Sequence, residues 1–266
     1  MGLPLFDVNN DPGASFQALM ASQGIDLFAP VDASAQPSAH ATTVVAVRFS
    51  GGVVLVADRQ ATSYKIASRD TRKIEAADRF SAVAISGSAA AGLNFIRVAQ
   101  LAFEHYEKLM DVTLSLEGKA NYLSPLIRYN NFSLGLMVLP MLAGWDQSRR
   151  QGRIFEYDGA GGCYERSDFA TIGSGTPFAE STLRLGFRSD LTQSEALELA
   201  ALAIYEAGDN DPSTGGPDFV RNLFPMMVTI TEAGFEELPQ EFAATTFRTI
   251  LERRTASGGM AGGTLR

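Results

Sequence analysis

Cysteine and histidine are scarce in this chain of 266 residues, which contains one cysteine and two histidines. Cys163 has no second cysteine with which to form an internal disulfide, and no histidine lies near it at a spacing typical of metal ligands. His40 and His105 are too few to build a histidine-based metal site. We therefore expect a protein of a reducing compartment that uses no metal and no cofactor, and we do not expect Cys163 to be a nucleophile.

Long apolar runs and clusters of positive charge are also missing. The longest apolar stretch, residues 134–145, is interrupted by Gly135, Pro140 and Gly144, and it is shorter than the roughly 20 residues of a membrane-spanning helix. The first residues, MGLPLFDVNN, have neither the basic start of an export signal nor a myristoylation motif. The net charge of −8, with both signs interspersed, argues against nucleic acid or a membrane as partner. We expect a cytoplasmic protein.

Three segments of different composition divide the chain. Residues 1–41 are rich in Pro, Ser and Ala and low in hydrophobicity, which is typical of a mobile leader. At Thr42 the composition changes to two β-branched runs, TTVVAVRF and VVLVADRQ, separated by Ser50-Gly51-Gly52 as in a hairpin. We expect one folded domain over residues 42–254 and a frayed, Gly-rich tail over residues 255–266.

Alternating and 3.6-residue hydrophobic patterns predict an α+β fold. Strands are expected at residues 42–49, 53–60, 71–74, 81–85, 134–139, 152–157, 163–166, 169–172, 226–231 and 236–238. A helical pattern that includes His105 starts at residue 89, and further helices are expected at residues 116–128, 178–185 and 193–207. This order of strands and helix pairs indicates two sheets packed face to face with two helices outside each sheet, a four-layer αββα sandwich.

The residues that can carry chemistry lie in six short motifs. These are Thr42-Thr43, Asp58-Arg59, Lys73 after Arg69-Asp70, Gly87, Gly173-Ser174-Gly175 and Asp211-Pro212-Ser213-Thr214-Gly215. Each motif alone has an ordinary explanation, because a Thr-Thr pair often reflects strand propensity and an Asp-Arg pair often forms a solvated turn. Their order and spacing together resemble the proteasome β subunit family, and most closely its actinobacterial type.

The resemblance extends from about residue 42 to residue 254. It rests on TTVVAVRFSGGVVLVADRQAT, SRDTRK, AISGSAAAG, FEHYEKL, LPMLAGWD, IGSGTPFAESTL and DNDPSTGGPDFVRNLFP. It implies the four-layer fold of N-terminal nucleophile hydrolases, with two mainly antiparallel sheets, and the activity of a threonine endopeptidase. The implied partners are α subunits and other β subunits in stacked heptameric α7β7β7α7 rings, unfolded protein substrates, and an ATPase regulator that acts through the α ring. The chain itself has no phosphate-binding loop, so we do not expect it to bind ATP.

An N-terminal threonine would explain why the chain can work with so little histidine. A threonine hydroxyl is essentially un-ionised at neutral pH and needs an adjacent base. Cleavage between Ala41 and Thr42 would free an α-amino group with a reference pKa of about 8, which can take the hydroxyl proton. The sequence therefore predicts that Thr42 is the nucleophile and that residues 1–41 are a propeptide removed on maturation.

The resemblance assigns the remaining catalytic roles residue by residue. Lys73 matches a lysine whose charge lowers the pKa of the nucleophile and its amine, and Asp58 matches the carboxylate that holds that lysine. Gly87 matches the main-chain oxyanion donor. The alternative for Lys73 is an ordinary surface lysine, and the alternative for Asp58 is a turn cap.

A second group of residues matches the supporting network around the nucleophile. It consists of Ser174, Asp211 and Thr214, which by resemblance orient the amine and relay protons. Thr214 stands where family members often carry serine, and the hydroxyl is preserved. The alternative for all three residues is hydrogen bonding within their loops only.

The substrate pocket and the maturation site carry further expectations. By resemblance the pocket for the residue before the cut is lined by Ala61, Thr71, Glu75, Ile85 and Ala89. These residues favour an apolar side chain, and an inward-pointing Glu75 would instead accept a basic one. Ala41 stands where the family usually has glycine, and glycine reaches the strained backbone needed for self-cleavage more readily. We therefore expect slow or assembly-dependent maturation.

Two other functions remain open at this point. A ring subunit that Ala41 prevents from maturing would be structural and have little activity, because Thr42 would never gain a free amine. A small-molecule amidohydrolase on the same fold is the third possibility, since one fold hosts many activities.

Overall fold

The computed structural model describes residues 18–19, 22, 42–62, 66–133 and 137–256. Ala41, almost all of the expected propeptide and the expected tail from residue 257 onward lie outside these residues. Helix α6 continues through Ala256, two residues into the stretch expected to be a frayed tail.

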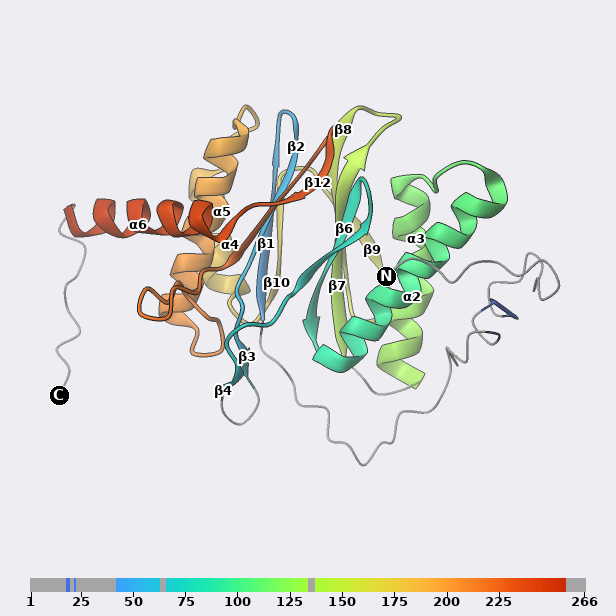
Figure 1. The fold of residues 1–266 in the computed structure, drawn as a ribbon, viewed down its shortest axis with the longest axis horizontal. Helices are drawn as coiled ribbons and strands as arrows, with labels where there is room; N and C mark the ends of the chain where they lie inside the picture. The colour runs from blue at the N-terminus through green and yellow to red at the C-terminus, as the bar shows by residue number, and fades with distance from the viewer. Residues whose placement is uncertain (1–17, 20–21, 23–41, 63–65, 134–136, 257–266) are drawn as a thin grey trace.

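Two five-stranded sheets form the centre of the molecule (Figure 1). All neighbouring strands within each sheet are antiparallel. The first sheet has the order β10-β1-β2-β11-β12, with bounds Phe169–Gly173, Thr43–Phe49, Gly52–Ala57, Met226–Thr231 and Gly234–Glu237. The second has the order β5-β6-β7-β8-β9, with bounds Ile74–Asp78, Ser81–Gly87, Val138–Asp146, Gln151–Tyr157 and Cys163–Arg166. A short ribbon of β3 (Ala61–Thr62) and β4 (Ile66–Ser68) stands apart from both sheets.

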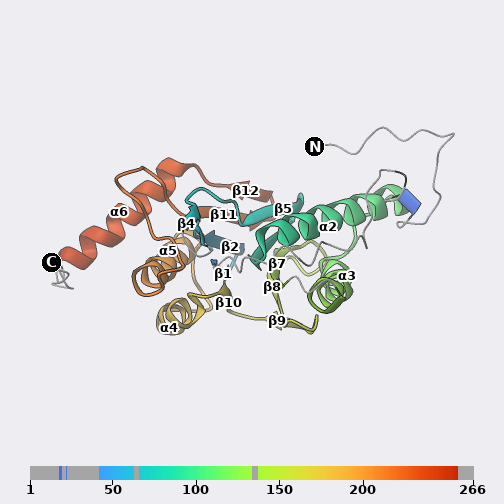
Figure 2. The same ribbon diagram turned by 90° about the horizontal axis from the view of Figure 1, so that it is seen from below.

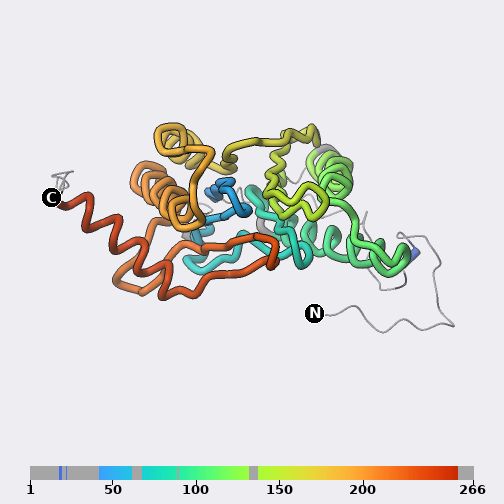
Figure 3. The backbone as a smooth tube through the Cα atoms, turned by 90° about the horizontal axis from the view of Figure 1, so that it is seen from above, coloured from blue at the N-terminus to red at the C-terminus, as the bar shows by residue number. Residues whose placement is uncertain are grey.

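Helices cover the outer face of each sheet, as the turned views in Figures 2 and 3 show. Helices α2 (Ala89–Met110) and α3 (Leu116–Arg128) pack on the second sheet, and a π-helical turn, Tyr129–Ser133, follows α3. Helices α4 (Thr176–Gly186) and α5 (Gln193–Asn210) pack on the first sheet. Helix α6 (Gln240–Ala256) packs against α5 and β11. The α+β fold and its four layers, predicted from the sequence, are confirmed.

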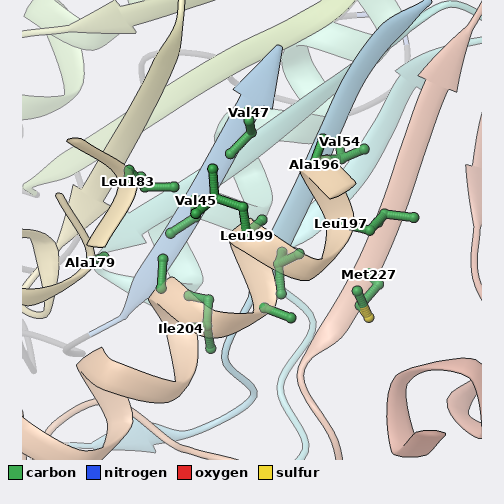
Figure 4. Close-up of a cluster of buried hydrophobic side chains, with 14 of the residues drawn as sticks. Val45, Val47, Val54, Ala179, Leu183, Ala196, Leu197, Leu199, Ile204 and Met227 are labelled. Atoms are coloured by element: carbon green, nitrogen blue, oxygen red, sulfur yellow. The ribbon is translucent and has the colours of Figure 1, made fainter. Parts of the chain in front are cut away.

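Strand β1 shows how the sequence builds these layers. Val45 and Val47 belong to the cluster beneath α4 and α5 (Figure 4). Val44 and Ala46 belong to the cluster between the two sheets. Because successive side chains of a strand point to opposite faces, a strand buried on both faces is apolar at every position. Burying one such valine contributes about 1.5 to 3 kcal/mol. The β-branched run after Thr42 therefore fixes the start of the domain inside the sandwich.

Several features of the fold differ from the sequence-based expectation. The strand expected at residues 71–74 is β5 and begins only at Ile74, and the strand expected at residues 134–139 is β7 and runs from Val138 to Asp146. Pro140 lies inside β7 at a position that pairs with β6 only, because the pairing of β7 with β8 begins one residue later, at Met141. A proline is tolerated there because its missing N–H faces no second neighbouring strand. Helix α6 and the β3–β4 ribbon were not predicted at all.

Candidate active site

Thr42 lies at the entry to the first sheet, where the main chain holds it in place. Its carbonyl oxygen accepts a hydrogen bond of 3.0 Å from the Ser174 N–H, and the next residue, Thr43, pairs with Gly173 across β1 and β10. Gly173 has a φ of +111°, and a β-carbon on it would lie 1.5 Å from the Thr42 oxygen. Only glycine permits this approach. Thr42 itself is 4% exposed.

A buried ion pair joins Asp58, just after β2, to Lys73, just before β5. The Lys73 Nζ lies 2.6 Å from the Asp58 Oδ1 and 2.5 Å from the main-chain oxygen of Gln60. The same Oδ1 accepts the Thr43 N–H at 2.9 Å. The other oxygen, Oδ2, accepts the N–H groups of Gln60 at 3.0 Å and Gly215 at 2.9 Å. Four donors therefore fix the orientation of one carboxylate.

Burial and mutual attraction oppose each other in this pair. Burial raises the pKa of Asp58, whereas the charge and hydrogen bond of Lys73 and the backbone N–H groups lower it. Burial likewise lowers the pKa of Lys73, and the charge of Asp58 opposes that shift. Burial thus weakens the hold of Lys73 on its proton, while the Asp58 carboxylate fixes the position of its Nζ.

A second polar cluster lies at the end of α5 and the start of α4. The Asp211 Oδ2 accepts the hydroxyl groups of Ser174 at 2.5 Å and Thr214 at 2.6 Å. Its Oδ1 accepts the Ser213 N–H at 3.0 Å. Burial pushes the pKa of Asp211 upward, but these hydrogen bonds and the charge of Lys73 together hold it below its ordinary value. Asp211 is therefore a carboxylate at neutral pH.

Thr43 links the two clusters. Its N–H donates to Asp58, and its Oγ1 lies 2.6 Å from the Thr214 Oγ1 and accepts the Gly175 N–H at 2.9 Å. Five of the predicted catalytic residues are thereby brought into one connected hydrogen-bond network around the start of β1. The network joins Asp58, Lys73, Ser174, Asp211 and Thr214 through Thr43.

A pocket opens in front of Thr42. Its lining includes Thr42, Lys73 and Gly87, together with Ala61, Thr71, Arg72, Ile85, Ser86 and Leu93. Gly87 ends β6 with a φ of +100°, and a β-carbon there would lie 2.3 Å from the Met137 oxygen. The pocket thus unites the predicted nucleophile, the predicted lysine and the predicted oxyanion donor.

The predicted substrate-binding residues divide into two groups. Ala61, Thr71 and Ile85 line the pocket with Thr42. Glu75 is not among the residues that line it, and its carboxylate accepts a hydrogen bond of 3.0 Å from the Arg72 Nε. Ala89 begins α2, and its side chain lies outside the described part of the structure.

Arg72 connects Glu75 to a second acidic residue on β12. Its two terminal nitrogens donate to the carboxylate oxygens of Glu237 at 3.1 and 2.8 Å. The hydrogen bonds that Arg72 donates to Glu237, followed by the one that it donates to Glu75, raise the pKa of Arg72. Glu75 therefore faces a permanently charged partner rather than an empty space for a basic substrate side chain.

Some groups of the site were given no role by the sequence. Gln60 contributes its main-chain oxygen and N–H, and Gly215 and Gly175 contribute N–H groups. Main-chain groups are present at every position, so residue type gives no signal for them. The Thr43 hydroxyl was missed because strand propensity already explained a threonine at that position.

The described residues contain neither a candidate group of metal ligands nor a candidate membrane-spanning helix. No group of three His, Cys, Asp or Glu side chains in these ranges is arranged to hold a metal ion. None of the described helices combines the length and apolar character needed to cross a bilayer. Cys163 lies on β9, where burial raises the pKa of its thiol, the opposite of what a nucleophile needs.

Comparison with known proteins points to one family. The family model described as Proteasome subunit matches residues 38–219, a range that contains every predicted catalytic residue. A proteasome subunit beta of Acidimicrobium ferrooxidans is 43% identical over 263 residues, which cover 95% of this chain and 96% of that protein. A proteasome subunit beta of Streptomyces griseus is 47% identical over 218 residues, with 81% and 78% covered, and one of Frankia alni is 43% identical over 225 residues, with 83% and 82% covered. The resemblance predicted from the motifs is confirmed.

Proposed function

Because the chain belongs to the proteasome subunit family, we propose that it is a catalytic β subunit of the core particle, a threonine endopeptidase. The observation that carries this proposal is that Thr42, Lys73 and Gly87 line one pocket, with Lys73 fixed by the buried carboxylate of Asp58. A purely structural subunit has no need for a buried ion pair beside a threonine, because burying two charges is costly.

Maturation begins with cleavage of the peptide bond between Ala41 and Thr42. The Thr42 hydroxyl attacks the Ala41 carbonyl, the bond to the Thr42 nitrogen breaks, and water hydrolyses the resulting ester. The products are the released segment 1–41 and a free α-amine on Thr42. The domain of residues 42–254 is then the mature catalytic unit.

Peptide hydrolysis follows with the freed amine as general base. The amine takes the proton of the Thr42 hydroxyl as the oxygen attacks the substrate carbonyl, and Lys73 favours this step because its charge lowers the pKa of both groups. The Gly87 N–H donates to the developing oxyanion. The amine returns the proton to the leaving nitrogen, and a water molecule then hydrolyses the acyl ester and regenerates the hydroxyl. The cluster of Ser174, Asp211 and Thr214 orients the amine and relays protons.

We propose that the substrate residue before the cut is apolar. Ala61 and Ile85 provide apolar pocket walls, and Arg72 occupies the Glu75 carboxylate that a basic side chain would need. In a series of fluorogenic peptides, cleavage after Leu, Tyr or Phe is expected to be faster than cleavage after Arg or Lys. The opposite order contradicts this specificity.

The proposed assembly is the stacked-ring particle that the family membership implies. The chain forms heptameric rings with other β subunits, and these rings stack on α subunits as α7β7β7α7. Unfolded proteins reach the inner chamber through an ATPase regulator that acts on the α ring. The single cysteine and the reducing environment that it suggests support a cytoplasmic location.

The decisive experiment replaces Thr42 with Ala in the full chain, co-produced with its α partner. We expect the wild-type chain to lose residues 1–41 by intact mass and to hydrolyse peptides, and Thr42→Ala to do neither. Thr229→Ala, at a buried threonine of β11 in the same sheet, is the matched control and is expected to mature and to hydrolyse peptides. A wild-type chain that keeps its full length in assembled particles would instead establish a structural, unprocessed subunit.

A further inference from the structure

Thr43 contacts both polar clusters of the site, and it does so through different groups. Its N–H donates to Asp58, and its hydroxyl lies between the Gly175 N–H and the Thr214 hydroxyl. The residue is completely buried. A buried threonine whose main chain and side chain are both engaged by polar partners is more constrained than strand propensity requires.

The number of protons fixes the direction of the hydrogen bonds. A hydroxyl has one proton to donate, and Thr214 uses its proton toward the Asp211 carboxylate. The proton shared between the two threonines must therefore come from Thr43. The resulting chain of donors runs from the Gly175 N–H through Thr43 and Thr214 to Asp211.

This chain holds the residue next to the nucleophile. Successive side chains point to opposite faces of a strand, so Thr42 can face the pocket while Thr43 faces the network. The Thr42 carbonyl is held by the Ser174 N–H, and the Thr43 side chain is held on the other face of the strand. Rotation of the strand end about its axis would break both sets of bonds.

We propose that the Thr43 hydroxyl is a positioning group that fixes the Thr42 nucleophile and polarises Asp211. This inference rests on the proposed threonine endopeptidase activity. Thr43 does not line the pocket, so its hydroxyl acts on the turnover rate and leaves substrate binding unchanged. A donor that itself accepts a hydrogen bond donates more strongly, and the Thr43 proton therefore strengthens the bond from Thr214 to Asp211.

The test compares Thr43→Ser with Thr43→Ala in the full chain assembled with its α partner. Both variants lack the threonine methyl group, and they differ from each other by one oxygen atom. We expect Thr43→Ala to lower kcat about tenfold with KM within about twofold, which is the effect of losing about one net hydrogen bond. Thr43→Ser is expected to recover most of the loss. Self-cleavage is measured in both variants as well, because it uses the same Thr42 hydroxyl as peptide hydrolysis. If Thr43→Ser matures and Thr43→Ala does not, that result also supports the proposal.

A double-mutant cycle separates positioning from general destabilisation. Thr43→Ala combined with Thr214→Ala is expected to lower kcat no further than Thr214→Ala alone, because both changes break one chain. Thr43→Ala combined with the control Thr229→Ala is expected to show additive effects on kcat. Equal kcat values for the Ser and Ala variants, or additive losses for Thr43 and Thr214, would overturn the proposal. Activity that survives Thr42→Ala would overturn both the endopeptidase proposal and the role of Thr43. Activity that depends on Thr42, with additive losses for Thr43 and Thr214, would overturn only the role of Thr43.

Discussion

Replacing Asp58 with Asn tests the buried ion pair at the centre of the site. Each carboxylate oxygen accepts two donors, Lys73 and the Thr43 N–H on Oδ1 and two backbone N–H groups on Oδ2. Asparagine offers one oxygen and one NH₂ group. In either orientation of the amide, the NH₂ group faces two hydrogen-bond donors and can accept from neither. The lysine is left charged with a side chain only 4% exposed.

The expected cost follows from that burial. Breaking a buried pair by removing one partner costs about 3–5 kcal/mol. For a domain of this size that cost lowers the unfolding temperature by about 6–20 °C. The pKa of Lys73 falls further, because burial then acts without the opposing charge of Asp58. We expect Asp58→Asn particles to melt earlier and to lose peptide hydrolysis.

Thermal unfolding of assembled particles and hydrolysis of an apolar fluorogenic peptide measure the two effects. Asp70→Asn is the matched control, because Asp70 pairs with Arg59 but its side chain is 59% exposed, and exposed pairs contribute only about 0–1 kcal/mol. Adding Lys73→Met to Asp58→Asn is expected to restore part of the stability and none of the activity, since it removes the stranded charge. An Asp58→Asn particle that melts within about 2 °C of wild type would refute the reasoning.

Three further predictions follow from other contacts. Arg72→Gln releases Glu75 from its ion pair, so we expect the ratio of cleavage after Arg to cleavage after Leu to rise; an unchanged ratio would show that Glu75 does not reach the substrate. The pKa of Asp211 is lowered in the folded state, so its contribution to stability is present above its unfolded pKa of about 3.9 and is lost as the pH falls through the folded value. Acid unfolding monitored by tryptophan fluorescence is therefore expected to be less steep in Asp211→Asn than in wild type, and equal slopes would contradict this. Ala41→Gly is expected to accelerate loss of the leader in a time course of intact mass, because glycine reaches strained conformations more easily; equal rates would remove Ala41 as the cause of slow maturation.

Most of the fold was predictable because its strands are buried on both faces or alternate regularly. Helix α3 and strands β9 and β11 have the predicted bounds, Leu116–Arg128, Cys163–Arg166 and Met226–Thr231. Helix α6 was missed because it contains several threonines, which have low helix propensity. In the structure Thr245, Thr246 and Thr249 donate their hydroxyl protons to carbonyl groups four residues earlier. Packing against α5 and β11, which no local pattern reveals, stabilises the helix.

The candidate site was predictable to the extent that side-chain type reveals it. The family motifs identified Asp58 and Lys73, and the structure places their charged atoms 2.6 Å apart. Their catalytic roles stay predictions. The main-chain donors that orient Asp58 were not predictable, because N–H groups give no signal in residue type and the one on Gly215 comes from a loop distant in sequence. The position of Glu75 outside the pocket was not predictable either, since it depends on Arg72, which also binds Glu237 on the distant strand β12.

The ion pair also joins the two halves of the sandwich. Asp58 follows a strand of the first sheet, and Lys73 precedes a strand of the second. The lysine therefore meets its carboxylate only after the two sheets have docked on each other. A copy that is still half-folded has the same threonine but lacks the charge that would activate it. Under the proposed function, proteolytic competence is in this way a late property of folding, and the protein is protected from its own activity until its architecture is complete.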